Sequence, residues 1–393
     1  MKYDRAFFDR GLDRRGTQSE KWDDRDVLNA DCIPLWVADM DFPCADEIRQ
    51  ALLERAVHPS YGYNAEDTKD TDAFCGYWRR RHGLTILAEQ TQMLPCVVTG
   101  LRICVRAFTT PGDQVGIFSP CYGPFAESVR GNGRELKAIP LLHGEDGRFQ
   151  MNLAALEEAL KGGVKLFMLC NPQNPVSRAW RREELEALLR LLKKYRVPLV
   201  SDEIHADFVF APNAFVPMLS IPEARDCTVM LCAASKTFNV AGLQQSEAVC
   251  MNAEMLSRFR DVYHASGATA GNTFALAGTR AAYTACDAWL DGLISYLDEN
   301  RRALPGMIEK YLPKARLTPI EATYLAWIDL TDYGMNCEQL DKAFKDHGVA
   351  LVRGTFFGPE GEGHMRLNFG CPRAQLEEGI RRMGEAVKEE KKA

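Results

Sequence analysis

The stretch that decides the fold runs from Cys227 to Asn239 and has the sequence Cys-Thr-Val-Met-Leu-Cys-Ala-Ala-Ser-Lys-Thr-Phe-Asn. Its first eight residues are almost wholly apolar, which is typical of a buried strand. The polar residues that follow place Lys236 just beyond the end of this predicted strand. Burial lowers the pKa of a lysine and makes its amine nucleophilic, so Lys236 is a candidate covalent catalyst. Taken alone, it could equally be one of the solvated cations among the 48 Lys and Arg residues.

Two upstream stretches have the same organisation. One apolar run ends in Asn171–Pro175 (Asn-Pro-Gln-Asn-Pro), where proline prevents a central strand from continuing. Another lies within Val197–His205 (Val-Pro-Leu-Val-Ser-Asp-Glu-Ile-His) and ends near Asp202. Asn174, Asp202 and Lys236 therefore follow three strands at intervals of about 30 residues, as crossover connections between parallel strands require. Ligands bind beyond the carboxyl ends of such strands, so the three side chains are predicted to form one site.

These motifs resemble those of the fold-type-I pyridoxal phosphate (PLP) enzymes, the aspartate aminotransferase superfamily. Ile33–Phe42 (Ile-Pro-Leu-Trp-Val-Ala-Asp-Met-Asp-Phe) and Met365–Pro372 (Met-Arg-Leu-Asn-Phe-Gly-Cys-Pro) narrow the likeness to the MalY/PatB type of cystathionine β-lyases, the carbon–sulfur lyase branch. The resemblance covers essentially the whole chain. It implies an α/β fold with a mostly parallel seven-stranded sheet between helices in a large domain, and a smaller α+β domain.

The length and the pattern of elements predict how the chain is divided. At 393 residues it exceeds one ordinary domain. Strands and helices alternate from about residue 97 to residue 251, and the pattern changes near residue 290, where a long helical stretch leads into a smaller lobe. We expect residues 1–45 to form an extended N-terminal arm and part of the small domain, residues 46–288 the large PLP-binding domain, and residues 289–393 the C-terminal small domain.

Composition excludes several classes of partner. The hydrophobic content of 46% and the charged content of 26% are those of a soluble globular protein. A formal net charge of −6 argues against nucleic acid and anionic membranes as partners. The 13 cysteines show no Cys-x-x-Cys pair or zinc-like spacing, so reduced thiols and no metal site are expected. The sequence also has no apolar leader and no apolar run of about 18 residues, so a cytoplasmic location is predicted.

The resemblance implies a role for each strand-end residue. Lys236 would bind the PLP aldehyde covalently and, once the substrate amine displaces it, would act as general base on the α-proton. Asp202 would pair with the pyridine nitrogen. Asn174 would hydrogen-bond the ring's phenolic oxygen and contact the substrate, and His205 either shares the first role or is an ordinary core histidine. Tyr122, which follows another predicted strand, would stack on the cofactor ring and is the second candidate catalytic residue.

A phosphate-binding turn is expected near Gly100. Val97–Thr99 is predicted as a short strand and Ile103–Phe108 as a helix, so the backbone amides of Gly100, Leu101 and Arg102 would open that helix and suit a phosphate. Arg102 stands where the family usually has a small aliphatic residue. It therefore either faces solvent or adds charge near the phosphate.

The remaining predicted site residues also come from the resemblance. Ser235 would help to bind the phosphate, because Ala233 stands where many relatives have a hydroxyl. Tyr63 would reach across a homodimer to the partner's phosphate. Arg366 would hold the substrate α-carboxylate through its planar guanidinium, and the backbone of Ala38 would add a contact to the same group.

Three functions remain open at this point. The first is a PLP-dependent carbon–sulfur β-lyase that converts cystathionine, cysteine or an S-conjugate into a thiol, pyruvate and ammonia. The second is an aminotransferase for an aromatic or other amino acid, which would use the same residues. The third is a PLP-bound protein whose main task is to bind a regulatory partner. Residue spacing does not separate them.

Overall fold

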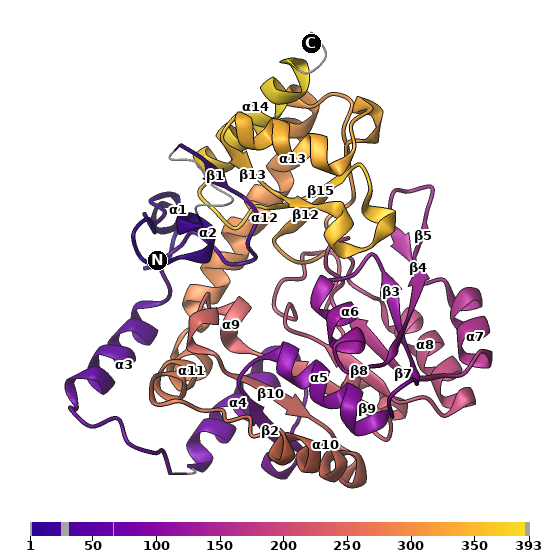
Figure 1. Cartoon of the computed structure of the whole chain (residues 1–393). Helices are drawn as coiled ribbons and strands as arrows, with labels where there is room; N and C mark the ends of the chain where they lie inside the picture. Colours follow the sequence, from indigo (N-terminus) through magenta and orange to yellow (C-terminus); the bar gives the residue numbers. More distant parts are fainter. Residues whose placement is uncertain (1, 25–30, 66, 390–393) are drawn as a thin grey trace.

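The computed structural model describes residues 2–24, 31–65 and 67–389. Its main feature is a seven-stranded sheet in which every strand except the antiparallel β10 runs in one direction (Figure 1). From edge to edge the strands are β2 (Thr91–Leu94), β10 (Ser246–Val249), β9 (Thr228–Cys232), β8 (Leu199–Asp202), β7 (Val164–Cys170), β3 (Gln114–Ser119) and β4 (Glu135–Pro140). The predicted mostly parallel sheet is confirmed.

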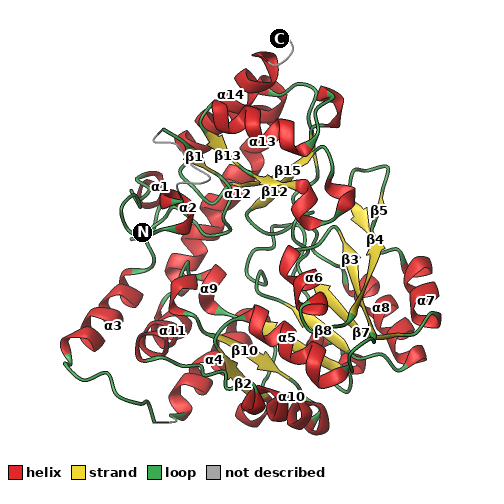
Figure 2. Cartoon of the chain, viewed as in Figure 1, coloured by secondary structure: helices red, strands yellow, loops and turns green. Residues whose placement is uncertain are grey.

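Helices cover both faces of this sheet (Figure 2). In β7, Leu166 and Met168 face one hydrophobic cluster while Phe167 and Leu169 face another, as the alternation of a strand buried on both sides requires. The helices against the large sheet are α4 (Thr68–His82), α5 (Val97–Phe108), α6 (Gly123–Arg130), α7 (Leu153–Lys161), α8 (Arg182–Tyr195), α10 (Ala253–Ala265) and α11 (Thr273–Ala285). The short helix α9 (Ala234–Thr237) follows β9 directly and carries Lys236.

A second, smaller sheet lies toward the C-terminus of the chain (Figure 1). Its four antiparallel strands are β11 (Arg316–Leu317), β12 (Leu325–Asp329), β15 (His364–Asn368) and β14 (Val352–Arg353), in that order. The surrounding helices are α12 (Asp287–Tyr311), α13 (Cys337–Asp346), α14 (Arg373–Glu389) and the 3₁₀ helix η6 (Gly354–Phe357). Two strand pairs complete the fold: β1 (Ile33–Pro34) with β13 (Val349–Ala350), and β5 (Leu142–His143) with β6 (Phe149–Gln150).

The N-terminal segment is not the extended arm that the sequence predicted. It forms two short helices, α1 (Arg5–Asp9) and α2 (Glu20–Asp23), ahead of α3 (Asp46–Val57). The reason is local: Asp4 caps α1 by accepting a hydrogen bond from the Phe7 amide, and Phe8 is fully buried. The buried Phe8 therefore anchors this largely charged segment. The segment is too short for its apolar residues to show a helical period.

The predicted strand at Val97–Thr99 is wrong. The strand in this region is β2, which ends at Leu94, and α5 already begins at Val97. Pro95 lacks an amide donor, which favours ending the strand before the helix starts. Within the described residues, no helix is both long enough and apolar enough to cross a membrane.

Candidate active site

A cleft of about 170 Å³ opens at the carboxyl ends of β8 and β9. Lys236, Asp202, Tyr122 and Ser235 all line it, so four of the predicted residues meet at one place. Asp202 is the last residue of β8, and Lys236 lies in the helix that follows β9. The remaining lining residues are Pro95, Cys96, Val97, Val98, Ile204, Ala233, Ala241, Gln244 and Gln245.

Burial sets the electrostatics of this cleft. It raises the pKa of Asp202 to about 7, although the Ile204 amide donates to that carboxylate at 3.1 Å. Burial also lowers the pKa of Lys236, with Asp39 acting in the opposite direction. The amine donates a hydrogen bond to the carbonyl oxygen of Ala38 at 2.7 Å. The cleft therefore contains an amine and a carboxyl group that both ionise less readily than in water.

His205 is buried, and its Nδ1 makes no hydrogen bond to any residue that the structure describes. Burial lowers the pKa of the ring to about 3, so the imidazole is neutral. The ring packs against the edge of Tyr324 at a centroid distance of 5.9 Å. A buried imidazole with an unused nitrogen has hydrogen-bonding capacity left for a ligand.

Arg366 and Asn174 meet beside the cleft. Arg366 lies on β15, and its guanidinium donates to Asn174 Oδ1 at 3.3 Å and to the Trp36 carbonyl at 2.8 Å. Its Nε has no hydrogen-bond partner among residues 2–24, 31–65 and 67–389, and burial lowers the pKa of the side chain to about 10. The guanidinium also lies 4.9 Å from the centre of the Phe357 ring. No carboxylate of the described residues neutralises this cation, which leaves it able to bind an anionic ligand.

Residues 35–42, which we call the strap, cross the site and are held by β15 of the smaller sheet and by the segment that follows α9. Asn368 donates to the carbonyls of Val37 and Asp39, each at 2.6 Å. Asn239 donates to the Met40 carbonyl at 2.9 Å and accepts from the Met40 amide. These two asparagines were not predicted as site residues, although each lies within a quoted motif.

Tyr324 is a further residue of the site that the sequence did not reveal. Its hydroxyl donates to the Ala38 carbonyl at 2.9 Å, so this oxygen accepts from both Tyr324 and Lys236. None of the motifs quoted above contains Tyr324.

Because α5 begins at Val97, the backbone amides that lack an intrahelical partner are not the ones predicted from the sequence. Gly100 donates its amide to the Cys96 carbonyl at 3.2 Å, inside the helix, and Leu101 is fully buried one residue further on. Gly100, Leu101 and Arg102 therefore do not open the helix, which corrects the predicted phosphate turn. The amides without an intrahelical partner are those of the first helical residues, Val97–Thr99.

Arg102 and Tyr63 both lie at the surface of the chain. Arg102 is exposed on α5, which favours the solvent-facing alternative left open by the sequence. Tyr63 is fully exposed in the segment between α3 and α4, which projects from the body of the chain (Figure 1). Within one chain, Tyr63 is not among the residues that line the cleft.

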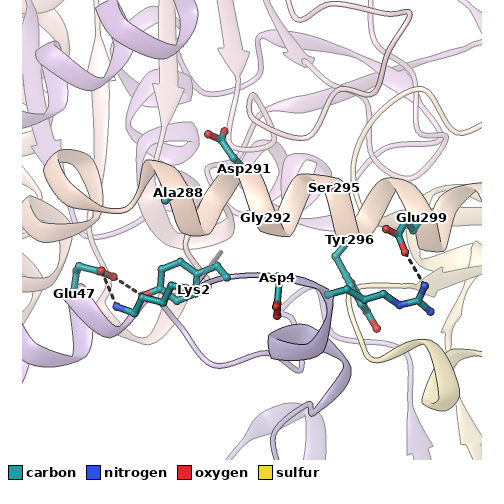
Figure 3. A pocket seen from close by; sticks show the side chains of 11 residues that line it. Lys2, Asp4, Glu47, Ala288, Asp291, Gly292, Ser295, Tyr296 and Glu299 are labelled. Atoms are coloured by element: carbon teal, nitrogen blue, oxygen red, sulfur yellow. Dashed lines mark hydrogen bonds and ion pairs between the residues drawn. The ribbon is translucent and has the colours of Figure 1, made fainter.

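A larger cavity of about 600 Å³ lies between the N-terminal segment and α12. Figure 3 shows two ion pairs among its lining residues: Lys2 lies 2.9 Å from Glu47, and Arg5 lies 3.5 Å from Glu299. None of the strand-end residues lines it. Because these ion pairs join the N-terminal segment to the rest of the chain, we interpret the cavity as part of the surface on which α1 packs.

Comparison with known proteins defines the class. Residues 30–383 match the family model for aminotransferase class I and II, and the chain belongs to that family. Among its relatives, cystathionine β-lyase PatB of Bacillus subtilis is 40% identical, over 97% of this chain and 99% of that protein. Protein MalY of Escherichia coli is 32% identical, over 97% and 98%. The crystal structure of cystalysin from Treponema denticola, which contains pyridoxal 5′-phosphate, superposes with a TM-score of 0.92 at 28% identity, covering 96% of this chain and 98% of that one.

These findings confirm the resemblance to the MalY/PatB type. The chemistry of the cleft also fits PLP. Lys236 and Asp202 line the cleft and offer an amine for its aldehyde and a carboxyl group for its pyridine nitrogen. His205 is not among the lining residues, but its unused imidazole nitrogen could serve the ring oxygen of the cofactor. The free amides at the start of α5 suit its phosphate.

Proposed function

We propose that this chain is a PLP-dependent carbon–sulfur β-lyase that cleaves cystathionine and related cysteine conjugates. The relatives named cystathionine β-lyase support this assignment, since the first covers almost the whole chain. The observation that carries it in the structure is the convergence of Lys236 and Asp202 on one cleft, beside the Arg366–Asn174 contact.

The reaction needs a proton acceptor close to the substrate α-carbon. When bound, PLP withdraws electrons from that carbon and lets it lose a proton. Lys236 would hold the cofactor aldehyde and, once the substrate amine displaced it, would take up the α-proton, for which its lowered pKa suits it. The Cβ–S bond then breaks, its electron pair leaves with sulfur, and the thiolate takes up a proton. Water hydrolyses the remaining three-carbon fragment to pyruvate and ammonia.

Other residues would bind and orient the cofactor and the substrate. Asp202, as a carboxylate, would hold the pyridine nitrogen in its protonated form. His205 and Asn174 would bind the ring oxygen, and the Tyr122 ring, which lines the cleft, would cover the cofactor. Arg366 would bind the substrate α-carboxylate in place of part of its contact with Asn174.

The phosphate would lie at the start of α5. Val97 and Val98, with their free amides, and Ser235 line the cleft there. We also propose a homodimer in which Tyr63 completes the partner's phosphate site. Its full exposure in the single chain supports this, because a hydroxyl that serves another subunit has to point outward.

Location and domain division complete the proposal. We place the protein in the cytoplasm, and the 13 free cysteines support this because thiols stay reduced there. We assign residues 46–288 to the large domain, and residues 289–393 with part of residues 1–45 to the small domain. The pairing of β1 with β13 supports the last assignment.

The test is a pyruvate assay with cystathionine and no keto-acid acceptor. The loaded protein should release pyruvate, ammonia and homocysteine in equal amounts, and Lys236→Ala should release none. If turnover required a keto acid and left pyridoxamine phosphate on the protein, the chain would be an aminotransferase.

A further inference from the structure

The helix that carries Lys236 is too short to be stable by itself. α9 has only four residues, and no side chain caps its start at Ala233. A single helical turn does not persist in isolation, so contacts with other parts of the chain have to fix it. The hydrogen bond from Lys236 to Ala38 of the strap is one such contact, but the amine gives it up when it reacts. Once released, the amine therefore depends on other residues for its position.

Thr237, the last residue of α9, is anchored to a buried carboxylate. Its hydroxyl donates to Asp207 Oδ2 at 2.6 Å, and the side chain of Asp207 is only 5% exposed. The other carboxylate oxygen accepts from the Tyr77 hydroxyl at 2.6 Å and lies 3.2 Å from His82 Nε2. Burial acts to raise the pKa of Asp207, but the neighbouring His82 and the two hydroxyl donors outweigh it. The pKa lies below its usual value, so Asp207 is ionised.

This carboxylate joins the two strand ends that form the site. Asp207 lies shortly after Asp202, on the segment that leaves β8. Thr237 directly follows Lys236, on the segment that leaves β9. The hydrogen bond between Asp207 and Thr237 therefore fixes the amine relative to the carboxyl group that is assigned to the pyridine nitrogen.

We infer that Asp207, acting through Thr237, positions the amine of Lys236 to take up the α-proton of the substrate. Asp207 is not among the residues that line the cleft, so it is a positioning residue and not a catalytic one. A misplacement of about 1 Å can slow a reaction roughly 100-fold, so a small shift of α9 is enough to matter. This inference rests on the proposed role of Lys236 as proton acceptor, and it does not depend on which bond breaks afterwards.

The test measures exchange of the α-proton of L-alanine for deuterium in heavy water, by proton NMR with the PLP-loaded protein. Alanine has no leaving group on Cβ, so the exchange reports on proton transfer alone. Thr237→Val keeps the shape of the side chain but lacks the hydroxyl, and at saturating alanine it should slow the exchange roughly 10- to 100-fold. Thr237→Ser restores the hydroxyl and should exchange close to the wild-type rate.

Tyr77→Phe is the matched control. It removes a hydrogen bond from the same carboxylate, at the oxygen that does not accept from α9. Tyr77→Phe and Thr237→Val should lower the melting temperature of the cofactor-free protein by similar amounts, because each leaves the buried carboxylate with one donor fewer. Bound PLP, measured by absorbance, should be equal in both variants. Only Thr237→Val should lose exchange.

The outcomes separate this inference from the proposed function. Exchange at the wild-type rate in Thr237→Val, or an equal loss in Tyr77→Phe, would overturn the inference. A wild type that did not exchange the alanine proton would overturn the role of Lys236 as well. A wild type that exchanged it but released no pyruvate from cystathionine would overturn the lyase function and leave the inference standing.

Discussion

The amine of Lys236 and the carbonyl oxygen of Ala38 are joined by a hydrogen bond of 2.7 Å. Tyr324 donates to the same oxygen at 2.9 Å. When Lys236 binds an aldehyde it gives up this bond, and Tyr324 remains to hold Ala38. The backbone that is expected to meet the substrate carboxylate is therefore positioned by the residue that directly precedes β12.

We predict that Tyr324→Phe raises the KM for cystathionine and leaves the PLP content unchanged. The variant removes one hydrogen bond, worth about 0.5–1.5 kcal/mol, so KM should rise roughly two- to tenfold. Steady-state kinetics and cofactor absorbance would test this. Tyr195→Phe, which removes a hydroxyl bonded to Glu157, is the matched control. Loss of PLP with an unchanged KM would contradict the assigned role.

Arg366→Lys should reduce kcat/KM while PLP still binds. Lysine keeps the charge but lacks the planar fork that binds a carboxylate bidentately. Losing one charged hydrogen bond costs about 1.5–3 kcal/mol, or roughly 10- to 150-fold in kcat/KM. The same substitution should matter far less for an amine substrate without the carboxylate, and an equal loss with both substrates would exclude carboxylate binding.

Tyr63→Phe should weaken PLP binding without unfolding the chain. One hydrogen bond to a charged phosphate is lost, so the affinity should fall roughly 10- to 150-fold. Because Arg102 is exposed on the outer part of α5, it is not expected to compensate.

Subunit exchange shows which chain Tyr63 serves. Tyr63→Phe/Lys236→Ala protein mixed with wild type gives hybrids with one site that has Lys236 but lacks the partner's Tyr63. Such sites should hold PLP no better than Tyr63→Phe homodimers do. Wild-type affinity at that site would show that Tyr63 acts within its own subunit or not at all.

The raised pKa of Asp202 makes the stability of the cofactor-free protein depend on pH. Burial raises this pKa from 3.8 to about 7, so the folded form keeps a proton that the unfolded form has lost. Stability is therefore greatest below pH 4 for this group and falls as pH rises to 7, by about 4 kcal/mol at most. Denaturant unfolding of wild type and Asp202→Asn at several pH values isolates the contribution. An identical pH dependence in both proteins would contradict it.

The sequence correctly predicted that Asp202 and Lys236 lie close together, because both follow strand ends. Asp202 and Lys236 follow apolar runs, and the carboxyl ends of parallel strands meet at one edge of a sheet. The start of α5 could not be predicted in this way. The β-branched residues Val97 and Val98 favour a strand locally, and packing against the sheet overrides that preference. As a result, the amides predicted to be free lie about one helical turn beyond those that are free in the structure.

Contacts between segments that lie far apart in the chain could not be predicted from the sequence either. Tyr324 and Ala38 lie 286 positions apart, and no local pattern connects them. Lys21 looks like a surface cation in a charged segment, yet it is fully buried against Asp41. Its burial depends on a partner 20 positions away that is itself buried.

The most direct test of this account is the identity of the lysine that holds the cofactor. The loaded protein should be yellow, and borohydride should bleach it irreversibly and attach the cofactor to the protein. Peptide mapping by mass spectrometry should then find the modification on Lys236, and Lys236→Ala should acquire none. A bleached wild type whose modified peptide excludes Lys236 would contradict the assignment of the whole site.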